Sequence, residues 1–479
     1  MEPSRLERRG VPASIRPLLS RFGRALTAGV RWLRDVIDEV ASSTPARLAL
    51  VSFTAVVLVF VGLLSLPVSY RGEGAAEFNV VVFVAVSAVC VTGLTPVITE
   101  QYWSEFGISV ITLAIQVGGL GILTLASIMG MAVSKRLGVR QKLIAAQATN
   151  AVNLGAVGTL LRVVVITVLT AEVIVAALLF PRFLARGEEF GDALWYSVFY
   201  SISAFNNAGF TIHPGGMAHF ADDPWILLVV ALAVFVGSLG FPVILVLSLA
   251  WRRPKKWDLH TRLTLTVSLV LVVIGAALLA LFEWNNERTL GSKGFWQTVL
   301  EVVFAAVMPR SGGFATMDIA DMHQTSHLVL DMLMFIGGGS SSTAGGIKVT
   351  TLAVLLLAAL AEARGLDDVS VFHRRISPAT IRLAVAVMLV GVATVVGGSI
   401  IMLHVTKLPL DLVLFEVTSA FGTSGLTSGV SEASPPAGRY VLSVLMFQGR
   451  LGTITLAAAL ALQNQKRLFR YPEERPIIG

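Results

Sequence analysis

Long uninterrupted apolar stretches dominate the chain from residue 47 onward. Eight of them reach the roughly 20 residues that an α-helix needs to cross a lipid bilayer. The pattern predicts membrane spans over Leu48–Val68, Phe106–Val133, Gly158–Phe180, Trp225–Leu249, Leu263–Phe282, Leu328–Leu360, Ile381–His404 and Tyr440–Leu462. The expected fold class is therefore all-α and integral to a membrane, with eight transmembrane helices.

Every long connection between two spans contains a further apolar segment of about 10 to 15 residues, which is too short to cross a membrane. The four segments are Phe78–Val91, Ala193–Asn206, Phe295–Met308 and Leu410–Phe421. Each ends in small, turn-permitting residues. A helix that enters the membrane and stops part-way fits this pattern, so we expect four re-entrant half-helices.

The distribution of charge predicts how the chain is oriented. Lysine and arginine gather in the short connections, such as Ser134–Gln147 and Arg252–Arg262, whereas the long connections are neutral or acidic. The positive-inside rule then places the short loops and both termini in the cytoplasm. The arginine-rich first 46 residues have one apolar helical stripe, which fits either a helix on the membrane surface or a helix packed on a partner protein.

Composition removes two classes of function. Hydrophobic residues make up 55% of the chain and charged residues 14%, against about 25% charged in a typical soluble domain. A soluble multidomain enzyme is excluded, and we expect no enzymatic activity. The net charge of +7 lies mostly on the predicted cytoplasmic loops and tail. It therefore reflects topology, and no nucleic-acid partner is expected.

An internal fourfold repeat is the sharpest signal. A glycine followed by Leu or Phe closes each half-helix, at Gly93, Gly209, Gly313 and Gly425, with spacings of 116, 104 and 112 residues. Each unit has two spans, so successive units enter the membrane in the same orientation. We therefore expect four parallel span–half-helix–span repeats with pseudo-fourfold symmetry around a central pore. Their boundaries are 47–148, 149–258, 259–370 and 371–479, after a cytoplasmic tail over 1–46.

The ends of the half-helices predict a cation path. Helix carboxyl ends carry about −0.5 of an elementary charge, and four of them converging favour a monovalent cation. Loops of glycine and small residues can turn backbone carbonyls towards an ion in place of its water. No carboxylate lies within these loops, which argues against a divalent-cation site. The predicted filter residues are Val91, Thr92, Gly93, Asn207, Ala208, Gly209, Ser311, Gly312, Gly313, Thr423, Ser424 and Gly425.

The sixth span is interrupted by a run of glycine and hydroxyl residues that makes a poor helix, since each glycine costs about 1 kcal/mol against alanine. The run consists of Gly337, Gly338, Gly339, Ser340, Ser341, Ser342, Thr343, Ala344, Gly345 and Gly346. We expect this break to act as a gate below the filter. Arg450 is an intramembrane charge and is expected to face the pore and bond to the loop carbonyls. Glu301 and Glu416 lie inside half-helices and could be structural partners, for Arg310 or for backbone donors, or ion ligands; the structural role is favoured.

These motifs resemble the Trk/Ktr/HKT superfamily of potassium transporters, and most closely its bacterial Ktr (KtrB-type) membrane subunit. The resemblance extends from about residue 47 to the C-terminus and is strongest in Ser87–Leu94, Phe205–Phe210, Phe421–Leu426 and Ser342–Lys348. Glycine at all four filter positions implies a preference for potassium. In the third loop Gly312 replaces the alanine usual in the family, which adds flexibility there.

The resemblance also implies partners and location. It predicts a homodimer in the bacterial inner (plasma) membrane, controlled by a cytosolic nucleotide-binding ring of the KtrA/TrkA type. The segment Phe469–Pro472 is a candidate dimer contact. No phosphate-binding or dinucleotide motif occurs in the chain, so no organic cofactor is expected and nucleotide control must come from another protein.

Three functions remain open on the sequence. Channel-like potassium uptake leads. A sodium- or proton-coupled secondary transporter of potassium is an alternative, with sodium as a second candidate ion. A potassium-binding subunit of an ATP-driven pump is disfavoured, because such subunits carry spans beyond the four repeats and this chain has none.

Overall fold

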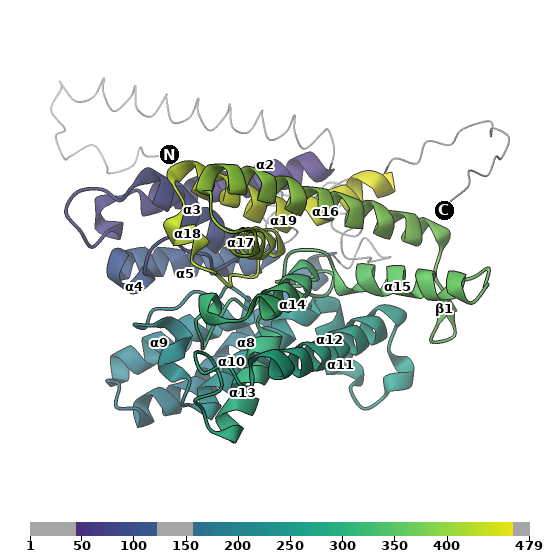
Figure 1. The fold of residues 1–479 in the computed structure, drawn as a ribbon, viewed down its shortest axis with the longest axis horizontal. Helices are drawn as coiled ribbons and strands as arrows, with labels where there is room; N and C mark the ends of the chain where they lie inside the picture. The colour runs from purple at the N-terminus through teal and green to yellow at the C-terminus, as the bar shows by residue number, and fades with distance from the viewer. Residues whose placement is uncertain (1–44, 122–156, 463–479) are drawn as a thin grey trace, which may run out of the picture.

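The computed structural model describes residues 45–121 and 157–462, and this part of the chain is almost entirely helical (Figure 1). One small antiparallel pair of strands, β1 (Ser370–Val371) and β2 (Arg374–Arg375), is the whole of the sheet structure in these residues, with Ser370 opposite Arg375. The predicted N-terminal helix, the Ser134–Gln147 loop and the Phe469–Pro472 segment lie outside the described residues.

A helix, a shorter helix and another helix follow one another four times along the chain. The first helices of the four sets are α2 (Pro45–Leu64), α8 (Val157–Ala185), α12 (Leu259–Glu283) and α16 (Pro378–Thr406). The short helices are α3 (Phe78–Val89), α9 (Phe190–Phe205), α13 (Phe295–Val307) and α17 (Leu410–Gly422). The last helices are α5 (Glu105–Gly119), α10 (Pro224–Leu239) with α11 (Phe241–Ala250), α14 (Gln324–Phe335) with α15 (Val349–Ala363), and α19 (Pro436–Leu462).

Short elements fill the connections between these helices. They are α4 (Thr99–Tyr102), α18 (Val430–Ala433) and the 3-10 turns η1 (Pro67–Ser69), η3 (Gly216–Phe220), η4 (Pro254–Lys256) and η5 (Ile319–Asp321). Side-chain caps define where several long helices begin. Ser104, Asp223, Asp258 and Ser377 accept hydrogen bonds from the first free N–H groups of α5, α10, α12 and α16, respectively.

Contacts between the four sets form a closed cycle. Helix α5 packs on α9, α10 on α13, α14 on α17, and α19 on α3, so the last helix of each set meets the short helix of the next. Figure 1 shows α2, α3, α16 and α19 together in the upper half of the molecule and α8 to α13 in the lower half. A single core of buried Val, Phe, Ala, Leu and Ile side chains runs through both halves.

Three described helices are long and apolar enough to cross a membrane: Arg162–Ala185, Leu259–Glu283 and Pro378–Thr406. A fourth is gained if α10 and α11 count as one span, although the chain bends there by 103°. Shorter apolar helices lie at three other predicted crossings: Leu50–Leu64, Glu105–Gly119 and Val349–Ala363. The count of eight spans therefore stays a prediction.

The predicted fourth span, Trp225–Leu249, is not one straight helix. It breaks at Gly240, which has a φ of +95°. A Cβ added to Gly240 would lie 2.5 Å from the Ser340 carbonyl oxygen. Pro242 follows in the first turn of α11, where its missing N–H is tolerated. The predicted sixth span, Leu328–Leu360, is interrupted over residues 336–348, between α14 and α15, where the glycine run lies.

Candidate functional site

The four predicted glycines lie against one another in a closed ring. A Cβ added to Gly93 would be 3.2 Å from the Cα of Gly209, and one added to Gly209 would be 2.7 Å from the Cα of Gly313. A Cβ on Gly313 would be 3.3 Å from the Cα of Gly425, and one on Gly425 would overlap the carbonyl oxygen of Thr92. The four loops thus meet in sequence order, with no room for a side chain at any of the four positions.

All four loops share the same pattern of positive φ. Two residues before each glycine, a residue with a side chain adopts positive φ, and the glycine itself does too. The pairs are Val91 (55°) and Gly93 (93°), Asn207 (61°) and Gly209 (70°), Ser311 (68°) and Gly313 (71°), and Thr423 (46°) and Gly425 (89°). Positive φ at a residue with a side chain is uncommon and costs of order 1–3 kcal/mol. The surrounding packing therefore holds four strained loops in the same shape.

Three of the four short helices end in the same Schellman cap, in which an N–H after the helix returns to a carbonyl five residues earlier. The bonds are Thr92 to Ser87 at 2.8 Å, Ala208 to Ser203 at 2.7 Å and Ser424 to Ser419 at 2.8 Å. Because each cap lies directly before a ring glycine, the negative carboxyl ends of these helices converge on the ring.

The third loop departs from the other three. It contains Pro309 and Arg310, and the N–H of Gly312 bonds to the carbonyl of Met308 at 2.7 Å. The buried guanidinium of Arg310 donates to the carbonyl and the hydroxyl oxygen of Ser268 on α12, at 3.0 and 2.9 Å. Arg310 thereby anchors its loop to the adjacent long helix.

Two buried glutamates hold the chain beyond the ring. Glu416 on α17 accepts bonds from the N–H groups of Ser428 at 3.0 Å and Ser431 at 3.1 Å. Glu301 on α13 accepts from the Thr316 hydroxyl at 3.2 Å and pairs with Lys293 at 2.7 Å. The expected bonds of Glu416 to backbone donors are present. The suggested pairing with Arg310 was wrong, because the Arg310 guanidinium is bonded to Ser268 on α12. The sequence pattern gives no way to anticipate this bond.

In the second loop, a buried tyrosine and a buried histidine hold the chain beyond the ring. The Tyr200 hydroxyl lies 2.9 Å from Nδ1 of His213, and the His213 ring stacks on Phe183 with 6.1 Å between centroids. Burial, together with the nearby His219 and Arg186, lowers the pKa of His213 to about 4. The imidazole is therefore neutral at physiological pH and acts as a packed aromatic ring.

Glycines on three of the last helices let these helices approach the short ones closely. A Cβ would overlap a main-chain carbonyl at each position: Gly118 meets Val89, Gly237 meets Phe205, and Gly449 meets Phe421. Each of these carbonyls belongs to the residue four places before a ring glycine. The inner helices are thus seated directly behind the ring.

The loop over 336–348 lies between the α10–α11 bend and the ring. On one side, the Thr343 hydroxyl donates to the Gly237 carbonyl at 3.0 Å and the Gly339 N–H to the Ser238 carbonyl at 2.7 Å. On the other side, the Gly345 N–H donates to the Ser311 hydroxyl at 3.2 Å. The structure therefore brings the predicted gate residues into direct contact with the predicted filter.

Two cationic side chains reach the same loop. The buried guanidinium of Arg450 donates to the Thr343 carbonyl and, at 3.0 Å, to the Gly118 carbonyl. The ammonium of Lys348, the cap residue of α15, donates to the carbonyls of Ala344 at 2.6 Å and Gly345 at 3.3 Å. Two basic side chains thus bond to carbonyls of the loop that contacts the ring.

A buried polar cluster beside the ring was missed by the sequence analysis. Glu172 on α8 accepts a bond from the Asn206 amide at 2.7 Å and one from the Gln116 amide at 3.1 Å. Asn206 is the residue before the strained turn of the second loop. Its partners come from α5 and α8, far apart in sequence, and a lone glutamate in an apolar span was the only signal available.

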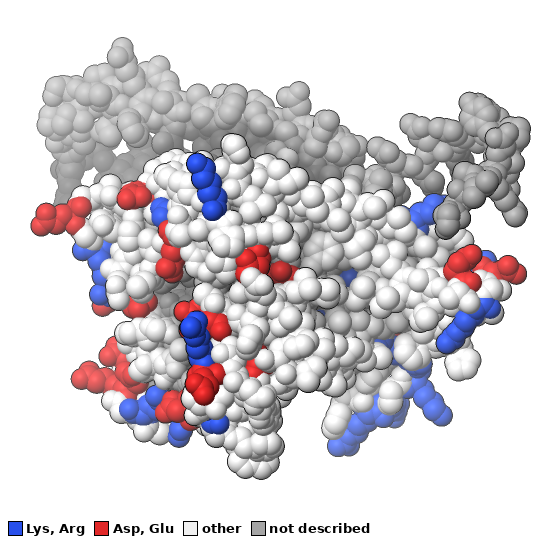
Figure 2. Space-filling model, viewed as in Figure 1, with Lys and Arg blue, Asp and Glu red and all other residues white. Residues whose placement is uncertain are grey.

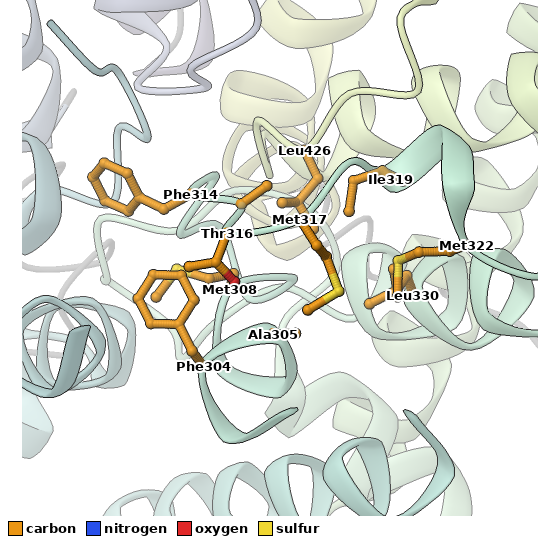
Figure 3. Close-up of a pocket in the computed structure, with 11 residues that line it drawn as sticks. Phe304, Ala305, Met308, Phe314, Thr316, Met317, Ile319, Met322, Leu330 and Leu426 are labelled. Carbon is orange, nitrogen blue, oxygen red and sulfur yellow. The ribbon is translucent and has the colours of Figure 1, made fainter. Parts of the chain in front are cut away.

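Figure 3 shows a small pocket behind the third loop, lined by Phe304, Met308, Phe314, Met317 and neighbouring apolar side chains. Its volume is about 10 Å³, at the lower limit for one water molecule. It is a packing space and offers no second route for an ion. Among the residues that the structure describes, no group of three His, Cys, Asp or Glu side chains could hold a metal ion.

Comparison with known proteins decides the family. The model of a family described as cation transport protein (TrkH) matches residues 32–471. The chain belongs to this family. It is also 33% identical to the Ktr system potassium uptake protein B of Bacillus subtilis, over 93% of this chain and 99% of that protein. The protein of the same name from Vibrio alginolyticus is 34% identical, over 94% and 98% of the two chains.

The name of a further relative includes sodium as well as potassium. The potassium/sodium uptake protein NtpJ of Enterococcus hirae is 31% identical, over 91% of this chain and 97% of that protein. The crystal structure of the potassium transporter TrkH from Vibrio parahaemolyticus has a TM-score of 0.63 at 19% identity, and covers 86% of this chain and 84% of its own. This similarity supports a helical fold of the same kind.

Proposed function

We propose that the chain takes up potassium ions across a bacterial plasma membrane, and that the ring of Gly93, Gly209, Gly313 and Gly425 is the selectivity filter. The observation that carries this proposal is the ring itself, in which four loops with the same pattern of positive φ meet through main-chain atoms at their glycines. Backbone carbonyls replace the hydration shell of potassium in such filters. The names of the Ktr system relatives support potassium as the ion.

The four units over 47–148, 149–258, 259–370 and 371–479 act in this proposal as parallel repeats around the pore, with α3, α9, α13 and α17 as re-entrant half-helices. The closed cycle of contacts between the sets supports the pseudo-fourfold arrangement. The converging carboxyl ends of the four half-helices stabilise a dehydrated cation just below the ring.

The loop over 336–348 with Arg450 forms the gate. An ion that leaves the filter inward would meet the loop backbone, the Arg450 guanidinium and the basic side chain of Lys348. Opening requires the loop to leave the positions where it is bonded to Gly237 and Ser311. Because this segment is not helical, it can move without unwinding α14 or α15.

Orientation follows from charge. Basic side chains gather at the lower right of the molecule in Figure 2, below a smaller acidic group at the right-hand edge, whereas acidic and basic side chains are mixed at the opposite end. We place the basic end in the cytoplasm, with both termini. There a cytosolic nucleotide-binding ring would dock on a homodimer of this chain. The word "system" in the relatives' names supports only the presence of further components.

Ion flux into proteoliposomes tests the proposal. With potassium, sodium and proton gradients imposed separately, a potassium-selective pore gives a reversal potential that follows the potassium gradient alone. A reversal potential that shifts with the sodium or proton gradient at constant potassium would show coupled transport and overturn the pore mechanism.

A further inference from the structure

A second site lies at the basic end of the molecule, away from the pore. Six residues line a cavity of about 400 Å³ between the start of α12 and the β1–β2 hairpin; we call it the hairpin pocket. They are Trp257, Leu259, Arg262, Phe372, His373 and Arg374. None of the six is acidic, and two are arginines.

The arginine on α12 is fixed in place. One nitrogen of the Arg262 guanidinium donates to the carbonyls of Pro254 at 3.0 Å and Lys255 at 3.1 Å. The same group lies 5.8 Å from the centre of the Phe372 ring, within range of a cation–π contact. A guanidinium held this way has lost its side-chain freedom before any ligand arrives, which favours binding. Its planar donors match the oxygens of a phosphate.

The opposite wall is a strained turn. Phe372 and His373 join β1 to β2 with φ of 49° and 61°, positions that glycine or asparagine normally fills in a two-residue hairpin. A bulky residue at positive φ is a genuine outlier. The strained turn places the rings of Phe372 and His373 on the pocket, where a typical turn would have small residues. Backbone strain of this kind clusters at functional sites.

The pocket lies at the level of a membrane surface. Helix α12 is long and apolar enough to cross, and its first residues, Leu259 and Arg262, line the pocket. Trp257 precedes the helix and Trp251, 65% exposed, lies nearby, as is typical of side chains at the bilayer interface. Figure 2 shows the basic side chains of this end gathered at the lower right.

We propose that the hairpin pocket binds the phosphate of an anionic phospholipid headgroup from the cytoplasmic leaflet. Arg262 and Arg374 hold the phosphate oxygens, and Trp257 and Phe372 cover the glycerol portion. Basic pockets between transmembrane helices on the cytoplasmic side bind headgroups in this way. The proposal rests on the orientation given above but not on the identity of the transported ion.

Lipid binding to the purified full-length protein provides the test. Phosphatidylglycerol or phosphatidylcholine is titrated into detergent-solubilised protein, and retained lipid is counted by native mass spectrometry. We expect R374Q to weaken phosphatidylglycerol binding about tenfold, because a charge-assisted hydrogen bond is lost. The control K256Q removes an equal charge from the same loop cluster outside the pocket, and should weaken binding less than about threefold in physiological salt, which screens exposed charges.

Two further variants keep the charge constant. R374K loses the planar fork and should weaken binding severalfold, whereas K256R should leave it unchanged. Equal losses in R374Q and K256Q would show diffuse attraction to a basic surface and overturn the proposal. Inorganic phosphate that competes fully with phosphatidylglycerol at millimolar concentration would point to a soluble phosphate ligand and overturn the lipid assignment. Because no transport is measured, failure here is separable from failure of the potassium pore.

Discussion

Arg450 on α19 donates a hydrogen bond to the carbonyl oxygen of Thr343, in the loop between α14 and α15. Its second bond, at 3.0 Å, goes to the carbonyl of Gly118 on α5. One buried guanidinium thus ties the loop to the inner helices of two other repeats. An unpaired charge among apolar helices is expensive, and the two carbonyl acceptors offset part of that cost.

Removing this charge should open the path. We expect R450Q to raise potassium flux about tenfold or more, because it removes both the positive charge near the path and the hydrogen bond to Thr343. A tenfold rise requires the free-energy barrier to ion passage to fall by only about 1.4 kcal/mol. Deletion within residues 339–345 should act in the same direction. Uptake of potassium into proteoliposomes, normalised to folded protein, measures both.

Arg439 supplies the matched control for Arg450. It lies on the same helix, α19, but bonds to Asn79 at 2.7 Å, away from the loop. R439Q removes an equal charge and should leave flux within twofold of the starting protein. Unchanged flux in a folded R450Q protein would contradict the gate assignment.

The ring glycines should determine ion selectivity. In G209A the added methyl would lie 2.7 Å from the Cα of Gly313, so the two loops must separate and the ring must widen. A wider ring no longer fits the potassium ion, and we expect the potassium-to-sodium permeability ratio to fall at least tenfold. Reversal potentials under opposed potassium and sodium gradients measure this ratio.

Gly74 separates the effect of the ring from the effect of backbone strain. It also has positive φ, 94°, but has no neighbour within 4 Å of an added Cβ. G74A carries the same cost of about 1–2 kcal/mol for a left-handed backbone and should keep the selectivity unchanged. Equal selectivity in G209A and the starting protein would argue against the ring as the filter.

Close helix packing behind the ring gives a stability prediction. A Cβ at Gly237 would overlap the Phe205 carbonyl, whereas a Cβ at Gly397, within α16, meets nothing within 4 Å. G237A should therefore lower the melting temperature in detergent. G397A should leave it unchanged or raise it, since alanine is favoured over glycine in a helix by about 1 kcal/mol. If G237A melted at or above the temperature of G397A, the inner helix would not be seated on the carbonyl.

Local chemistry explains what could be predicted from the sequence. The ring was predictable because four loops repeat one local motif, in which a glycine follows a helix end at a fixed distance. The interruption at 337–346 was predictable because a glycine run disfavours a helix wherever it lies. Neither inference needs knowledge of what the segment packs against.

The remaining features depend on distant partners. Gly240 alone does not specify a 103° bend; the turn is completed by the N–H of Phe241, which donates to the Ser341 carbonyl at 3.2 Å, a hundred residues away. The bonds of Asn206 to Glu172, and of Arg310 to Ser268, likewise require that separate helices first come together. Such partnerships are fixed by tertiary packing and leave no periodic trace in the chain.

The loop beyond Gly209 should make stability depend on pH through His213. Burial lowers the pKa of this side chain from its usual 6.5 to about 4, so between these values the unfolded chain binds a proton that the folded chain does not. Stability is complete above pH 6.5 and is lost as pH falls towards 4, by about 3 kcal/mol over the whole window. The melting temperature in detergent, measured from pH 7 to pH 4, should therefore fall less in H213N than in the starting protein. H404N, which changes an exposed histidine on α16, should retain the full fall. Equal slopes in H213N and H404N would show that the acid sensitivity arises elsewhere and that His213 does not hold this loop as a neutral ring.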